Sequence, residues 1–132
     1  AFGTILKEAQ IGEIIGNLLA SYQLGIFLPF IIAAAFKTAQ GSTTVAMVAT
    51  SAIIAPMLAS IGLDSLIGKV LAVMATGAGA MTISHANDSY FWVVTQFSGL
   101  DVKTGLKTHT VGTLIQGFSS IIFIYLLTLI FI

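Results

Sequence analysis

The sequence contains no cysteine and no arginine, and its five lysines and five acidic residues make up only 8% of 132 residues. Soluble domains carry about 25% charged residues, whereas 57% of this chain is hydrophobic and its mean hydropathy is +1.04. A chain of this composition lacks the polar side chains to cover a water-soluble globule. The expected fold class is therefore an all-α integral membrane protein with multi-pass helices.

Each absence also excludes a class of function. Without cysteine there is neither a disulfide framework nor a thiolate metal site, and His85 and His109 lack the spacing of zinc ligands. Few, scattered lysines and a net charge of zero exclude recognition of nucleic-acid phosphates. The stretch 77–82 lacks the third glycine of a dinucleotide-binding loop and follows no strand pattern. We expect no metal and no other cofactor.

The charged residues divide the chain into candidate membrane segments. A bilayer is crossed by roughly 20 helical residues, and four charge-free intervals are about long enough to enter or cross it: 14–36, 38–63, 70–87 and 108–132. From Ile121 onward the last interval is a run of mainly Ile, Leu, Phe and Tyr, which predicts a lipid-facing C-terminal transmembrane helix over 106–132. The charges expected to bracket elements are Lys37, Asp64, Lys69, Lys103 and Lys107.

The first 23 residues differ from these intervals. Apolar and polar side chains alternate there at roughly helical spacing, which predicts over 1–23 an interfacial amphipathic helix and the end of a preceding segment. The chain begins with Ala1 rather than Met, so we expect either a processed chain or a piece of a longer one.

A polar cluster at 38–44 separates two apolar arms, 24–36 and 45–58, each shorter than a full crossing. Non-helical backbone at membrane depth survives only where protein or a water-filled cavity satisfies it. The pattern predicts a re-entrant helical hairpin over 24–60 with its tip near 38–44. Two ordinary spans joined by a polar loop in water are the alternative, because short apolar runs are ambiguous.

A second polar cluster, 84–89, lies inside membrane-like sequence and reads Ser-His-Ala-Asn-Asp-Ser. An Asp costs about 2.5 kcal/mol or more at the centre of a membrane helix, and Asn, Asp and Ser side chains compete for the backbone. We therefore predict a discontinuous transmembrane helix over 66–99, broken near 84–89, with Asp88 as the one charge at membrane depth. Alternatively, Asp88 lies at a water interface where Tyr90 and Trp92 form an aromatic belt.

Polar clusters that interrupt apolar helices are typical of a transport site built from discontinuous helices. Half-helix N-termini can hold a carboxylate without arginine, and hydroxyls and amides suit a polyhydroxylated substrate. Asp88 and His85 are the candidates for proton coupling, although the His85 ring has a second interpretation, in which it only bonds a backbone carbonyl. The predicted substrate-binding residues are Gln40, Gly41, Ser42, Thr43, Ser84, Asn87 and Ser89.

Two other classes of protein fit parts of the pattern. Ser84, His85 and Asp88 are the residue types of a hydrolytic triad, but their crowding within five residues argues against triad geometry, so we expect no enzyme. A passive membrane assembly subunit is the other alternative, because small residues such as Gly77 and Gly79 also serve close helix packing.

The two clusters carry a resemblance to a known family. Residues 38–47 (TAQGSTTVAM) and 84–94 (SHANDSYFWVV) closely resemble the gluconate permease family of proton-coupled sugar-acid symporters, and the likeness extends through 53–57 and 105–108. Because members of that family are several times longer, the resemblance implies the C-terminal part of a multi-pass permease of the bacterial inner membrane.

What the resemblance implies is a secondary active transporter that imports gluconate or a related sugar acid by proton symport. Other organic acids and D-serine are alternative substrates within the family. The implied fold has two inverted repeats and an elevator-type movement, and this chain would supply the hairpin and broken helix of the second repeat. Asp88 is then either the proton carrier or a structural acceptor for half-helix N–H groups. The implied partners are the sugar acid, protons, the lipid bilayer, the remaining N-terminal half and, in the intact protein, a second copy in a homodimer.

Overall fold

The computed structural model describes residues 24–132, so the interfacial helix predicted over 1–23 lies outside the described residues. Within the described part of the chain every regular element is a helix. The elements are α3 (Phe27–Gln40), α4 (Thr43–Ile54), a 3₁₀ turn (Ala55–Met57), α5 (Leu66–Met81), α6 (Ser89–Phe97), α7 (Val102–Gly105), a π-helical turn (Leu106–Thr110) and α8 (Val111–Phe131).

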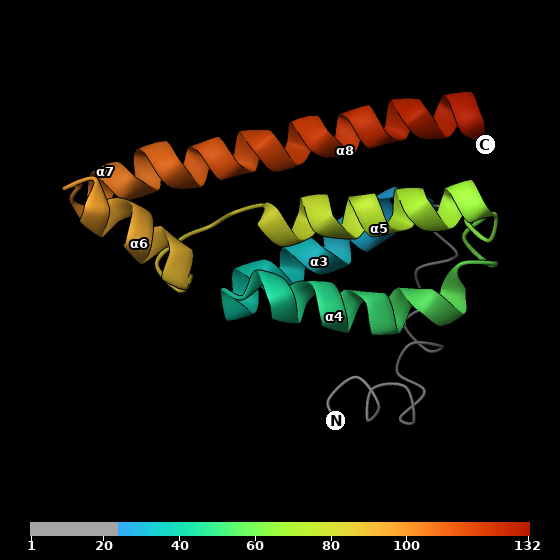
Figure 1. Cartoon of the computed structure of the whole chain (residues 1–132), viewed down its shortest axis with the longest axis horizontal. Helices are drawn as coiled ribbons and strands as arrows, with labels where there is room; N and C mark the ends of the chain where they lie inside the picture. The colour runs from blue at the N-terminus through green and yellow to red at the C-terminus, as the bar shows by residue number, and fades with distance from the viewer. Residues whose placement is uncertain (1–23) are drawn as a thin grey trace.

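The helices form an elongated bundle in which α5 is the common neighbour (Figure 1). It packs against α3, α4 and α8, while the short helices α6 and α7 lie at one end of the bundle. Small residues allow the close approach of α3 and α5, because a Cβ added to Gly79 would overlap the carbonyl oxygen of Phe30. Such packing of small residues is common between membrane helices.

Local sequence explains the ends of α3 and α4. Helix α3 ends at Gly41, which adopts φ 71°, a left-handed conformation that glycine takes without a steric penalty. Ser42 then caps α4, since its side chain accepts a hydrogen bond from the Val45 N–H at 3.3 Å. Two residues therefore join α3 to α4 inside the predicted tip range of 38–44.

Helix α5 begins and ends in different ways. Ser65 caps its start by accepting a hydrogen bond from the Gly68 N–H at 2.9 Å. The helix ends at Met81, and the chain runs without helix through 82–88 until α6 begins at Ser89. Ile83 in this stretch has φ 56°, an unusual value for a β-branched residue.

Helix length separates the elements into two groups. Within the described residues, one helical run, Val102–Phe131, is both long and apolar enough to cross a membrane. It starts four residues before the predicted boundary at 106, because α7 and the π-helical turn are continuous with α8. Helices α3 and α5 have 14 and 16 residues, and both are shorter than the roughly 20 residues that a crossing requires.

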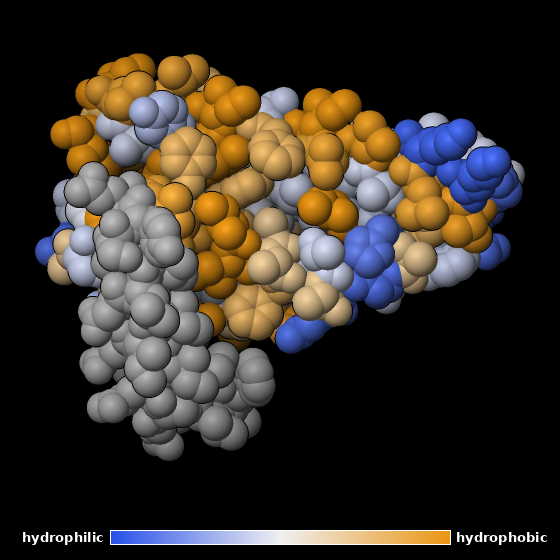
Figure 2. Space-filling model, turned by 180° about the vertical axis from the view of Figure 1, so that it is seen from behind, coloured by the Kyte–Doolittle hydropathy of each residue, from blue (hydrophilic) through white to orange (hydrophobic). Residues whose placement is uncertain are grey.

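The surface matches a membrane environment. Hydrophobic residues cover most of the face in Figure 2, and hydrophilic residues gather at the end that carries α7. Asp101, Lys103 and Lys107 are exposed at that end. Large apolar side chains such as Phe123 and Leu129 are exposed along the outer face of α8, where a soluble protein would carry polar ones.

Candidate functional site

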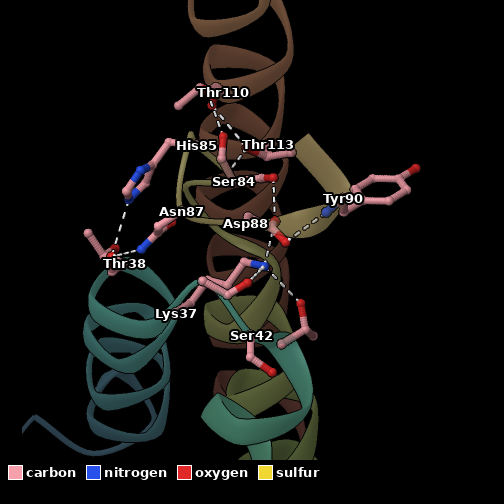
Figure 3. Close-up of polar contacts among 12 residues, drawn as sticks. Lys37, Thr38, Ser42, Ser84, His85, Asn87, Asp88, Tyr90, Thr110 and Thr113 are labelled. Atoms are coloured by element: carbon pink, nitrogen blue, oxygen red, sulfur yellow. Dashed lines mark hydrogen bonds and ion pairs between the residues drawn. The ribbon is translucent and has the colours of Figure 1, made fainter. Parts of the chain in front are cut away.

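The two polar clusters predicted from the sequence meet in space. The turn at Gly41 packs so closely against the break over 82–88 that a Cβ added to Gly41 would overlap the carbonyl oxygen of Asn87. The Asn87 side-chain amide donates a hydrogen bond of 2.7 Å to the carbonyl oxygen of Thr38, and His85 Nε2 lies 3.2 Å from the same oxygen. These contacts fasten the turn to the break (Figure 3).

A buried ion pair lies beneath this contact. Lys37 Nζ lies 2.6 Å from Asp88 Oδ2, and their side chains are only 3% and 7% exposed. The same ammonium donates to the Gly41 carbonyl oxygen and to Thr43 Oγ1, each at 3.1 Å. Each of its three N–H groups therefore has an acceptor, as a charge removed from water requires.

The carboxylate of Asp88 holds three groups at once. Its Oδ1 accepts a hydrogen bond of 3.1 Å from the Tyr90 N–H, which caps the start of α6. Its Oδ2 accepts from Lys37 and from the hydroxyl of Ser84. The structure thus places Asp88 inside the protein, 5% exposed, where it accepts a hydrogen bond from an N–H group at the start of α6.

Ser84 is held by the beginning of α8. Its N–H donates to Thr113 Oγ1 at 3.1 Å, and its carbonyl oxygen accepts from Thr110 Oγ1 at 2.6 Å (Figure 3). His109, in the π-helical turn Leu106–Thr110, places Nε2 3.1 Å from Ser84 Oγ. Side-chain hydroxyls therefore bond backbone groups of the non-helical stretch 82–88 that no helix satisfies. Isolated π turns of this kind are frequent at functional sites.

A cavity of about 700 Å³ opens where these elements converge. This volume lies within the range of about 300–1,000 Å³ that is typical of small-molecule sites. Its lining combines one charge pair with hydroxyl, imidazole and amide groups. The residues that line it are Lys37, Thr43, Met81, Ser84, Asp88, Tyr90, His109, Gly112, Thr113 and Gln116.

The predicted site residues divide into two groups. Thr43, Ser84 and Asp88 line the cavity, and Gly41 contributes its carbonyl oxygen to Lys37. The others lie around the contact between the turn and the break rather than on the cavity lining, and they are Gln40, Ser42, His85, Asn87 and Ser89.

One interpretation from the sequence needs correction. Asp88 was expected to be the one charge at membrane depth, and Lys37 a charge that brackets an element. Lys37 does lie in the last turn of α3, but it is buried there and paired with Asp88, so Asp88 is not the only buried charge. The position of Lys37 next to a polar cluster resembled that of a loop charge. The sequence signal for a buried Lys37 is its position four residues before Gly41. A lysine in the last turn of a helix can donate hydrogen bonds to the carbonyl groups at the helix C-terminus.

The beginning of the C-terminal helix is also more than a lipid-facing span. His109, Thr113 and Gln116 line the cavity, and their spacing of four and three residues places them on one face of a helix. The helical spacing of these three polar residues can be read from the sequence. The prediction of a lipid-facing helix over 106–132 rested instead on the apolar run from Ile121 onward.

The arrangement differs from that of a hydrolase. In a catalytic triad the carboxylate orients the histidine, which in turn activates the serine. Here the carboxylate of Asp88 accepts from Ser84 itself, and His109 lies on the other side of the serine hydroxyl. Among the described residues, no three His, Asp or Glu side chains gather as metal ligands would.

Comparison with known proteins identifies a family of membrane permeases. The model of the GntP family permeases matches residues 1–130. The chain is 42% identical over 120 residues to the inner membrane permease YgbN of Escherichia coli, a match that covers 89% of this chain and 26% of that protein. It is 35% identical over 130 residues to a gluconate permease of Pseudomonas aeruginosa, with 98% and 28% covered.

A third relative is named for a different substrate. The D-serine transporter DsdX of Escherichia coli is 32% identical over 131 residues, a match that covers 98% of this chain and 29% of that protein. The chain therefore spans about a quarter of the length of the curated relatives it matches. No solved structure matches it.

Proposed function

The chain belongs to the GntP family of membrane permeases, and from that premise we propose that it is the C-terminal part of a bacterial inner-membrane transporter that imports gluconate or a related sugar acid together with protons. It is a transporter sequence and not an enzyme. In the intact protein the N-terminal half completes the site, and two copies form the proposed homodimer.

The observation that carries this proposal is the cavity of about 700 Å³ around the buried Lys37–Asp88 pair. Hydroxyls from Thr43, Ser84 and Thr113 surround the pair. Hydroxyl groups both donate and accept hydrogen bonds, so they fit the several hydroxyls of a sugar acid, and the charged pair fits its carboxylate and the coupled proton.

The short helices support the proposed membrane arrangement. At about 1.5 Å per residue, the 14 residues of α3 rise only about 21 Å, against a hydrocarbon core of about 30 Å. We propose that α3 and α4 form a re-entrant hairpin and that α5 and α6 are the halves of a discontinuous helix. During transport the hairpin and the discontinuous helix then move together as one rigid body against a scaffold, in an elevator-type movement.

Uptake by the intact permease tests the function. In cells that lack their own sugar-acid permeases, we expect it to accumulate labelled gluconate or a related acid when the outside is acidic, and to lose that accumulation when a protonophore dissipates the gradient. Cells with the empty vector provide the background. Failure to take up any acid of the panel, or uptake that ignores the protonophore, would contradict the proposal.

D-serine is the second candidate substrate, favoured by the same ion pair. A zwitterion presents both an anion and a cation, and the cavity offers Lys37 and Asp88 as their complements. The uptake panel therefore includes D-serine, and competition against labelled gluconate decides between them. Stronger competition by D-serine than by unlabelled gluconate would assign the site to the amino acid.

A further inference from the structure

We propose that Lys37 binds the carboxylate of the substrate, and that a proton delivered to Asp88 through His109 and Ser84 frees Lys37 for that role. This inference rests on the transport function proposed above and names the residues that couple the two cargoes. It also assigns the substrate carboxylate to a lysine, where the sequence alone pointed to helix N-termini.

The ion pair is the only electrostatic compensation that Lys37 has among the described residues. Among the described residues, the only anionic partner of Lys37 is Asp88, at 2.6 Å, and its other two hydrogen bonds go to the neutral oxygens of Gly41 and Thr43. Removing the negative charge from a buried pair leaves the ammonium uncompensated, which is strongly unfavourable. Both partners line the cavity, so an entering carboxylate can replace that of Asp88.

The helix N-termini that were expected to hold an anion are capped by the protein's own side chains. At the start of α4 the Val45 N–H is bonded to Ser42, and at the start of α6 the Tyr90 N–H is bonded to Asp88. These caps use part of the donor capacity that an anion would need. The ammonium of Lys37 is the stronger electrostatic partner for a carboxylate in this cavity.

Ser84 connects His109 to Asp88. The hydroxyl of Ser84 donates to Asp88 Oδ2, and His109 Nε2 lies 3.1 Å from Ser84 Oγ. Because the only hydrogen of this hydroxyl points to Asp88, Ser84 Oγ is the acceptor from His109, and the network assigns a proton to Nε2. The three side chains therefore form a continuous chain of donors toward the carboxylate.

Other groups around Asp88 leave His109 as the proton source. The titratable side chains that line the cavity besides Asp88 itself are Lys37, Tyr90 and His109, and the Tyr90 ring stands edge-on to that of His109, with centroids 5.5 Å apart. The His85 ring lies against the Thr38 carbonyl instead. Elements α4, α5 and α8 line the cavity with uncharged residues, which are Thr43, Met81, Gly112, Thr113 and Gln116.

The proton balance of the step is simple. The step begins with His109 protonated on both ring nitrogens, as an imidazolium. Its Nε2 proton passes to Ser84 Oγ, while the hydroxyl proton of Ser84 passes to Asp88 Oδ2. An imidazolium and a carboxylate become a neutral imidazole and a neutral carboxylic acid. Lys37 is left as the unpaired charge of the cavity and takes the substrate carboxylate.

Two variants of the intact permease isolate the role of Lys37. Asp88→Asn imitates the protonated carboxyl and still caps α6, and the double variant Asp88→Asn/Lys37→Met removes the ammonium as well. Asp88→Asn leaves the Lys37 ammonium without its counter-charge, whereas the double variant leaves neither charge of the pair. Thermal unfolding of both variants is therefore measured beside binding, so that a loss of folded protein is not read as a loss of affinity. Gluconate binding to the purified proteins is measured at about pH 6 and about pH 8.

We expect the wild type to bind gluconate more tightly at the acidic pH and Asp88→Asn to bind it equally at both. The double variant should bind about 10- to 100-fold more weakly than Asp88→Asn, the loss expected for a charged hydrogen bond. Lys69→Met, a matched change at an exposed lysine, should bind as the wild type does. Equal affinity of the single and double variants would overturn this inference, whereas absence of binding by the wild type would contradict the proposed function instead.

His109→Gln tests the proton route, with His85→Gln as the matched change. Glutamine can still donate to Ser84 Oγ but cannot relay a proton, so accumulation driven by a pH gradient should fall about tenfold or more, while gluconate counterflow persists. His85→Gln should retain accumulation. An equal loss of counterflow and accumulation in His109→Gln, or loss of accumulation in His85→Gln alone, would overturn the assignment of His109.

Discussion

The two ends of α5 carry the same kinds of charges in opposite environments. At its start, Lys69 and Asp64 form an ion pair of 3.4 Å whose side chains are 52% and 70% exposed. Beyond its end, Lys37 and Asp88 pair at 2.6 Å and are almost fully buried. Exposed pairs contribute little to stability, whereas buried ionisable groups in a membrane protein are costly and usually functional. Of the two ion pairs, the buried Lys37–Asp88 pair is therefore the candidate for a functional role.

The backbone also differs between the two ends of α5, being ordinary at the start and unusual beyond the end. Ser65 starts α5 with an ordinary cap. At the other end Ile83 adopts φ 56°, and the backbone of Ser84 depends on hydroxyls from Thr110 and Thr113. Strained conformations persist only where their surroundings enforce them, and they cluster at functional sites. One end of α5 is an ordinary capped helix terminus, whereas the backbone beyond the other end is held in place by the side chains of Thr110 and Thr113.

The largest difference in stability between the two ends of α5 is expected when the lysine of each ion pair is replaced. In the intact permease, Lys37→Met leaves the Asp88 carboxylate buried and unpaired, which should lower the free energy of unfolding by about 3–5 kcal/mol. Lys69→Met at the exposed pair should cost about 0–1 kcal/mol. Thermal unfolding in detergent measures both. If the two variants lost equal stability, the burial argument for the Lys37–Asp88 pair would fail.

A smaller difference is expected for two glycines with similar backbone angles. Gly62, near the start of α5, has φ 76° and open space around it, whereas Gly41 has φ 71° and lies against the Asn87 carbonyl. Gly62→Ala should cost about 1–2 kcal/mol, the penalty of a left-handed residue. Gly41→Ala should cost more, because the turn must also move away from the break. Thermal unfolding measures the loss of stability in both variants. Equal losses would show that the packing of Gly41 against the Asn87 carbonyl is not tight.

The smallest difference in stability is expected for two serines. Ser65→Ala removes the cap of α5 and should cost about 1 kcal/mol. Ser84→Ala removes one hydroxyl from the buried network and should cost a similar amount, about 1 kcal/mol. Their effects on transport should separate them, because only Ser84 joins His109 to Asp88. Proton-driven uptake per folded molecule should fall for Ser84→Ala alone, and an equal fall for both would remove Ser84 from the proton route.

Much of the helical arrangement follows from local signals in the sequence. The glycine and serine at 41–42 end one helix and cap the next, and the cluster 84–89 contains most of the non-helical stretch. These are short-range effects of left-handed glycine, side-chain caps and turn-forming residues. Composition alone indicated the membrane class, which the family match supports.

The partners across the site could not be obtained in the same way. Lys37 and Asp88 are 51 positions apart, and His109 reaches Ser84 from a helix that looked like a plain apolar span. Such pairs depend on how helices pack, and no local pattern specifies which polar groups then face each other. The polar face of His109, Thr113 and Gln116 shows that helical spacing inside apolar spans still carries usable information.

Substrate protection at a single cysteine tests most directly the claim that the cavity beyond the end of α5 is the transport site. The described chain contains no cysteine, so Thr113→Cys in the cavity and Ser60→Cys near the other end of α5 add defined targets to an otherwise cysteine-free permease. We predict that gluconate slows labelling of Thr113→Cys by a membrane-impermeant thiol reagent and leaves Ser60→Cys unchanged. Labelling of Thr113→Cys at the same rate with and without saturating gluconate would contradict the account.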